Sequence, residues 1–262
     1  MEALNNSLAR SYDRENRGIP RLIAYHIARL VTTLDEHSVV HDNGCGPALV
    51  TSALLSVHGS KNFRVEATDL SAAMIEATDE IIEANGWKNV TATIQDSTKL
   101  SFEDNKFTHS FINFLVPIRP EEFGEIYRTL KPSGEAIYTM WKEHGFCAVM
   151  DRCTALVLPD SPQAKGFRSI VVDRDNIKQR FLDGGFRGED VKIDSHKEHL
   201  NFTDLDDLMA LATGPFGKFL TKDWKEGDLQ RLPQLVDQAL TAEERERKSL
   251  DMVAWVVIAK KA

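Results

Sequence analysis

The chain has 262 residues, and 40 acidic side chains against 32 basic ones give a formal net charge of −8. This balance argues against nucleic acid as a partner, because binding to phosphate backbones depends on clustered Lys and Arg. No apolar run reaches the roughly 20 residues of a membrane-spanning helix, and residues 1–6 lack the basic and apolar parts of a secretory signal. The three cysteines form no C-x-x-C pair, which argues against zinc and a disulfide framework. We therefore expect a cytoplasmic protein without a metal site that does not bind membranes.

The N-terminal part predicts a polar segment followed by an amphipathic helix. Residues 11–17 are polar apart from Tyr12; they form either a frayed terminus or a segment with a functional role. Helical spacing predicts a helix over residues 22–34 that packs before the first strand. Its apolar positions are Leu22, Ile23, Ile27, Leu30, Val31 and Leu34.

The most informative segment is Val39–Pro47, a β-branched stretch that leads into an acidic residue, a glycine turn and an apolar helix. Gly44 and Gly46 let the backbone bend sharply and approach a ligand, because no Cβ stands in the way. In doubly wound α/β proteins a strand, turn and helix of this kind form a nucleotide site at the carboxyl end of the first strand. Asp42 is unfavourable beside a pyrophosphate but favourable beside a phosphate-free cofactor that carries an ammonium and a sulfonium group.

A dinucleotide site is the first alternative for this turn. Its fingerprint is G-x-G-x-x-G, and the third glycine would fall at position 49, where the chain has Leu49. An NAD(P)-dependent oxidoreductase would also need a proton relay such as Tyr-x-x-x-Lys, and none is evident. The alternative is weakened but stays open.

An acid follows the second predicted strand, residues 63–68. Asp69 lies 23 residues after Gly46, where Rossmann-like sheets place an acid that binds ribose hydroxyls. A carboxylate can accept two charge-assisted hydrogen bonds from such a diol. Asp69 could instead cap the following helix, although Ser71 is the better-placed cap.

Polar residues also follow the next two predicted strands. Asp96 and Ser97 come after residues 91–95, and Asn113 ends the strand over 107–113. The alternatives are an ordinary turn acid at Asp96 and pairing with strand-end backbone groups at Asn113.

Together these segments resemble the class I S-adenosylmethionine (SAM) methyltransferases over roughly residues 38–142. Asp42-x-Gly44-x-Gly46 is similar to the first motif of that family, residues 65–74 (VEATDLSAAM) to its second, and residues 130–134 (LKPSG) to its turn before strand five. The resemblance implies an α/β fold, Rossmann-like and doubly wound, with a mainly parallel seven-stranded sheet, a C-terminal antiparallel hairpin and a helical lid. It also implies SAM as the cofactor, bound by Tyr12, Asp42, Gly44, Gly46, Asp69, Leu70, Met74, Asp96, Ser97 and Asn113. Met74 additionally has the spacing of a core residue.

The pattern loosens after residue 141. Helices are predicted over 146–158, 173–182 and 203–213, strands over 189–194 and 252–259, and a mobile Gly-Pro-Phe-Gly segment at 214–217. We expect a single domain over residues 1–262. It would carry an N-terminal cap over 1–36 and lid insertions around 145–172 and 203–240.

Methyl transfer requires that the nucleophile and the methyl carbon be held in line at close range, and a base only when the acceptor is protonated. His144 and His199 are the candidates for a base, although a lone histidine is more often a surface or packing residue. Aromatic residues could form the wall of an apolar acceptor site and favour a passing cationic methyl group, or simply pack in the core. These aromatic residues are Phe114, Trp141, Phe146 and Phe216.

We therefore expect a SAM-dependent methyltransferase that acts on a small-molecule acceptor with a sulfur, nitrogen, oxygen or carbon nucleophile. The chain is also similar to the small-molecule methyltransferases of fungal secondary metabolism. Two alternatives stay open, an NAD(P)-binding Rossmann oxidoreductase and a SAM-fold protein that uses the cofactor without methyl transfer. The oligomeric state is not predicted.

Overall fold

The computed structural model describes residues 9, 12–117, 119–160 and 171–262 of the chain. These residues contain a seven-stranded sheet with the strand order β3-β2-β1-β4-β5-β7-β6. Strands β1 to β5 pair in parallel, whereas β7 pairs antiparallel with both β5 and β6. The predicted α/β fold, with antiparallel strands at its C-terminal side, is confirmed. The strands are β1 (Val39–Asn43), β2 (Arg64–Asp69), β3 (Val90–Ile94), β4 (Phe107–Asn113), β5 (Leu130–His144), β6 (Val191–Asn201) and β7 (Ser249–Lys260).

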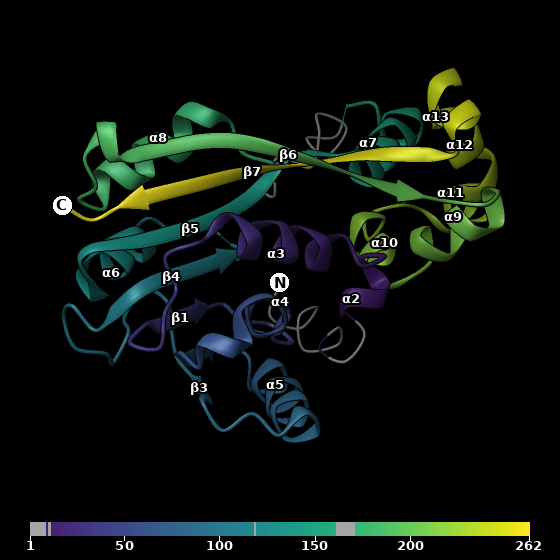
Figure 1. Cartoon of the computed structure of the whole chain (residues 1–262). Coiled ribbons are helices and arrows are strands. Elements are labelled where there is room, and N and C mark those ends of the chain that lie inside the picture. Colours follow the sequence, from purple (N-terminus) through teal and green to yellow (C-terminus); the bar gives the residue numbers. More distant parts are fainter. Residues whose placement is uncertain (1–8, 10–11, 118, 161–170) are drawn as a thin grey trace.

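Helices pack on both faces of the sheet (Figure 1). Apolar side chains of α3 and α4 form one core with β1 and β2, whereas α6 and α8 form another with β4, β5 and β7. Val40 belongs to the first core and Val39 to the second, because successive side chains of a strand point to opposite faces. The helices are α2 (Tyr12–Glu15), α3 (Ile19–Leu30), α4 (Leu49–His58), α5 (Ala72–Asn85), α6 (Pro120–Thr129), α7 (Gly145–Val157), α8 (Arg174–Asp183), α9 (Leu205–Ala212), α10 (Pro215–Leu220), α11 (Glu226–Gln230), α12 (Leu232–Ala239) and α13 (Ala242–Arg247).

Helices α7 and α9 to α13 gather at one end of the long strands β6 and β7 (Figure 1). Of these, α7, α9, α10 and α12 share a third core, to which α7 contributes Met150, α9 Leu208 and α12 Leu235. The expected lid insertions fall on these helices, except that residues 161–170 lie outside the described residues. Of the expected N-terminal cap, α2 and α3 are described, whereas residues 1–8 and 10–11 are not.

Several segments differ from the sequence prediction. Residues 130–134, expected as a turn, are the first residues of β5, and the helix expected over 22–34 runs from Ile19 to Leu30. Strand β6 extends to Asn201, beyond the predicted end at residue 194, because it pairs with β7 along its whole length although most of its added residues are polar. Residues 215–217 begin helix α10, with Gly214 at its N-cap, instead of forming a loop. Pro215 occupies the first turn, where it is tolerated, and Gly217 lies so close to α9 that a Cβ would be 2.1 Å from the carbonyl oxygen of Ala212.

Candidate cofactor and acceptor site

A cavity of about 340 Å³ lies at the carboxyl ends of the parallel strands. Its walls come from the segments that follow β1, β2, β3 and β4, together with helix α2 and the start of α6. Because parallel strands all end at the same edge of the sheet, segments far apart in the sequence meet there. In the part of the chain that the structure describes, no group of three or more His, Cys, Asp or Glu is arranged to hold a metal ion. Within the same residues, no helix is long and apolar enough to cross a bilayer.

The glycine turn after β1 has the left-handed backbone that its sequence predicts. Gly44 has φ 70° and Gly46 has φ 51°, values that L-residues with side chains rarely adopt. A Cβ on Gly44 would lie 2.6 Å from Cδ1 of Leu115, whereas a Cβ on Gly46 would meet nothing within 4 Å. Leu115 therefore leaves no room for a side chain at Gly44, whereas Gly46 leaves open space beside the cavity.

Asp42 is buried at the edge of the cavity. Its Oδ2 accepts hydrogen bonds from the backbone N of Thr51, at 3.0 Å, and from its hydroxyl, at 2.6 Å. These bonds satisfy a backbone group in the first turn of α4, which would otherwise lack a partner. Burial raises the pKa of Asp42 to about 6, against the effect of the Thr51 bonds and with that of nearby Asp69. The carboxylate is thus costly to ionise in the unliganded protein, and a cationic ligand would stabilise it.

Asp69 connects the two turns that border the cavity. Its Oδ2 accepts a hydrogen bond from the backbone N of Gly46 at 3.0 Å, and its Oδ1 accepts one from that of Ser71 at 2.9 Å. Burial raises its pKa, although these bonds lower it. Ser71 caps α5 through a bond from the backbone N of Met74, so Asp69 is not needed for that cap.

Of the ten residues implied as cofactor ligands, nine line this cavity. They are Tyr12, Asp42, Gly44, Gly46, Asp69, Leu70, Met74, Ser97 and Asn113. Asp96 is not among the lining residues: its Oδ1 accepts bonds from Thr98 and pairs with Arg119 at 2.8 Å. The burial of Tyr12 raises its pKa to about 12, with nearby Asp69 and Asp13 adding to the shift, so its hydroxyl stays protonated.

The sequence prediction missed several residues that line the cavity, among them Asn43, Arg119 and Glu122. Asn43 is buried, and its Nδ2 has no hydrogen-bond partner among the described residues. Arg119 and Glu122 begin α6 and pair at 3.0 Å. No sequence motif identifies these residues as part of a site. Asn43 occupies a variable position of the glycine motif, and Arg119 and Glu122 are of types that are common at the start of a helix.

The four aromatic residues expected around the acceptor are divided between two places. Phe114 lines the main cavity and stacks on Trp141 with ring centroids 4.1 Å apart. Phe146 and Phe216 border a separate cavity of about 20 Å³ beside α2. Trp141 and Phe146 are buried in the third core, so packing accounts for much of their role.

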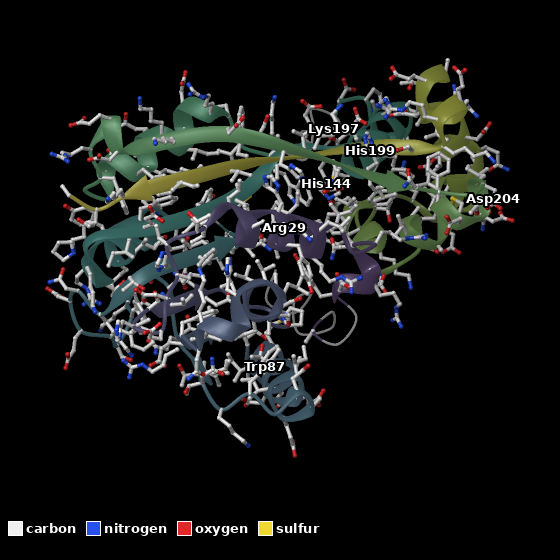
Figure 2. The ribbon with its side chains drawn as sticks, in the orientation of Figure 1. Arg29, Trp87, His144, Lys197, His199 and Asp204 are labelled. Carbon is white, nitrogen blue, oxygen red and sulfur yellow. The ribbon has the colours of Figure 1, made fainter. Side chains whose placement is uncertain are left out.

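Neither histidine lies against the main cavity, and Figure 2 shows the two on different elements. His144 is buried at the end of β5, where its Nδ1 accepts a bond from the backbone N of Cys147 at 3.3 Å. This bond leaves the ring proton on Nε2, and burial lowers the pKa of His144 to about 4. His199 lies half-exposed on β6, with its Nδ1 3.2 Å from Asp251.

Residues 40–134 match a protein family described as "Methyltransferase domain". This part of the chain is thus similar to a methyltransferase domain. Over 228 residues the chain is 23% identical to "Methyltransferase tpcH" of Aspergillus fumigatus, a match that covers 84% of this chain and 75% of the relative. Over 107 residues it is 24% identical to "Acetylaranotin bis-thiomethyltransferase" of Aspergillus terreus, covering 40% and 35%.

A solved structure of the phosphoethanolamine N-methyltransferase 2 of Haemonchus contortus, in complex with S-adenosyl-L-methionine, superposes with a TM-score of 0.56. The identity is 18%, and the match covers 92% of this chain and 53% of that one. At this identity the likeness shows the fold alone. The Rossmann-like methyltransferase fold agrees with the sequence prediction, and the oxidoreductase alternative is not favoured.

Proposed function

We propose that this protein transfers a methyl group from SAM to a small-molecule acceptor with a sulfur, nitrogen, oxygen or carbon nucleophile. The observation that carries the proposal is a pair of carboxylates, the buried Asp42 and the partly buried Asp69, on either side of a glycine turn that leaves open space. Three acids line the cavity, Asp42, Asp69 and Glu122, against one cation among the described residues, Arg119. This excess of negative charge suits a ligand with positive charge and hydroxyl groups, and it disfavours a pyrophosphate. A secondary metabolite is the proposed kind of acceptor, and the similarity to the acetylaranotin enzyme supports it.

The described residues fit the cofactor. Asp69 would accept hydrogen bonds from the ribose hydroxyls, Asp42 would balance the positive charge, and the unpartnered Nδ2 of Asn43 is available to donate to an oxygen of the ligand. Bound SAM supplies an activated methyl group on its sulfonium. The protein then has to orient the acceptor and exclude water; we assign these tasks to Phe114 at the end of β4 and to a cap formed by α2.

A single domain with a helical cap and lid, in the cytoplasm, completes the proposal. The three cysteines, all free and buried, support a reducing compartment.

A thermal-shift comparison of S-adenosylhomocysteine (SAH), SAM, NAD and NADP tests the proposed cofactor. We expect SAH and SAM to raise the melting temperature, since a ligand that binds only the folded state stabilises it, and NAD and NADP to leave it unchanged. Stabilisation by NAD without stabilisation by SAH would contradict the proposal. Release of SAH from SAM with a panel of thiols, phenols and amines would then separate methyl transfer from use of the cofactor as a bound cation.

A further inference from the structure

Four polar side chains join two walls of the main cavity. Asp96 and Ser97 follow β3, whereas Arg119 and Glu122 begin α6. The Arg119 Nη2 lies 2.8 Å from Oδ1 of Asp96 and 2.9 Å from Oγ of Ser97, and its Nε lies 3.0 Å from Oε1 of Glu122. Ser97 donates its hydroxyl to the same Glu122 oxygen at 2.9 Å. One guanidinium thus ties the turn after β3 to the start of α6.

Charge makes Arg119 indispensable to this arrangement. It is the one cationic side chain that lines the cavity within the described residues. Glu122 is only 3% exposed, and a buried carboxylate without a partner is strongly unfavourable. Burial raises the pKa of Glu122, and its hydrogen bonds with Arg119 and Ser97 and the charge of Arg119 oppose that rise. Arg119 therefore favours the carboxylate form of Glu122, in which both oxygens act only as hydrogen-bond acceptors.

We propose that Arg119 is a positioning residue for the nucleobase end of the cofactor, an assignment that rests on the proposed function. With the ribose on Asp69 at the end of β2, the base would reach the end of the adjacent β3, which Ser97 follows. Arg119 holds Ser97 and Glu122 at the cavity wall and favours the ionised form of Glu122 there. An acceptor-rich wall suits the exocyclic amino group of adenine, which donates hydrogen bonds, and it opposes the carbonyl oxygen of hypoxanthine at the same ring position. Arg119 acts through its neighbours and sets which base the cavity accepts.

The chain offers a matched control on the same helix. Arg128, in the last turn of α6, pairs with Glu125 at 2.7 Å and with Asp104 at 2.8 Å. It also donates to the backbone carbonyl oxygens of Phe102 and Leu100. Arg128 therefore ties the segment between β3 and β4 to α6 as Arg119 does, but it does not line the cavity. Loss of either arginine removes comparable contacts between α6 and the segment before β4, and of the two only Arg119 borders the cavity.

Isothermal titration with SAH and with its hypoxanthine counterpart, S-inosylhomocysteine, tests the assignment. We expect the wild type to prefer SAH, and Arg119→Met to weaken SAH binding roughly 10- to 100-fold, the range for losing hydrogen bonds that involve charged groups. The same variant should lose most of its preference for adenine. Arg119→Lys keeps the charge without the planar fork, so its affinity and preference should fall between the two. Arg128→Met should bind SAH within about twofold of the wild type.

The outcomes separate the two proposals. If the wild type does not bind SAH, the proposed function fails and this assignment fails with it. If the wild type binds SAH and Arg119→Met binds it equally well, only the assignment fails. Equal losses in Arg119→Met and Arg128→Met, with the preference for adenine unchanged, would show that Arg119 merely supports the fold. Should Arg119→Met not fold, Arg119→Lys decides: affinity and preference equal to those of the wild type would overturn the assignment.

Discussion

At the scale of single residues, ionising the Asp42 carboxyl group costs more free energy in the unliganded protein than it would in a complex with a cationic ligand. Its carboxyl group is buried, with a pKa raised to about 6. A raised pKa means that the folded protein binds this proton more tightly than the unfolded chain does. Stability from this group is therefore present at acidic pH and is lost as the pH rises from about 4 through about 6.

Asp42→Asn removes this cost while keeping an oxygen that can accept the Thr51 bonds. We expect the unliganded variant to have a higher free energy of unfolding than the wild type at pH 7.5, by an amount on the order of 1–3 kcal/mol, and to bind SAH more weakly. Urea denaturation at pH 4.5 and 7.5 measures the first effect. Asp79→Asn, on the exposed part of α5, is the control. A variant less stable than the wild type at pH 7.5 would show that the carboxylate has a compensating partner.

His144 has the opposite linkage. Burial lowers its pKa to about 4. Between about pH 6.5 and 4 the unfolded chain therefore binds a proton at this histidine that the folded protein does not bind, and stability falls as the pH drops through this range. We expect the stability of His144→Gln to fall less steeply than that of the wild type over this range, by roughly 1–3 kcal/mol. Denaturation curves at several pH values measure the slope. Equal slopes for the two proteins would mean that His144 is protonated in the native state.

At the scale of elements, the glycine turn depends on the segment after β4. Gly44→Ala would place its Cβ 2.6 Å from Cδ1 of Leu115 and would also force Ala into a left-handed conformation, which by itself costs about 1 kcal/mol. We expect a loss of stability of roughly 2 kcal/mol or more, of which Leu115→Ala in the same chain restores the steric part. A double-mutant cycle measures this coupling. Additive effects would show that Leu115 simply moves aside.

Local signals predicted the parallel half of the sheet and the residues of its turns. The turn at the glycines and the charge of Asp42 and Asp69 can be recognised from a few neighbouring residues. Their place at the cavity therefore follows from the sequence. The arrangement of Arg119 depends on contacts between two loops that are more than 20 residues apart, and no local pattern encodes such a pair. For the same reason β6 was predicted too short: its outer half owes its structure to β7, whereas its own residues are mostly polar.

At the scale of the whole molecule, α2 connects the N-terminal segment to both cavities. Tyr12 borders the main cavity, and Glu15 and Asn16 border the small one. A helix of four residues is marginal by itself, so ligand contacts should order it. We expect SAH to slow hydrogen exchange in residues 12–17 and in the turn after β1 and to leave β6 unchanged, as measured by mass spectrometry. Unchanged exchange in residues 12–17 would exclude α2 from the site.

Titration calorimetry of SAH against the wild type and Asp69→Ala measures whether the cavity between Asp42 and Asp69 binds the adenosyl cofactor. We expect saturable binding by the wild type and a loss of roughly 1–3 kcal/mol in the variant, as is usual when a charged hydrogen-bond partner is removed. Asp79→Ala should bind as the wild type does. Equal affinity of the wild type and Asp69→Ala for SAH would mean that the cofactor does not bind against Asp69.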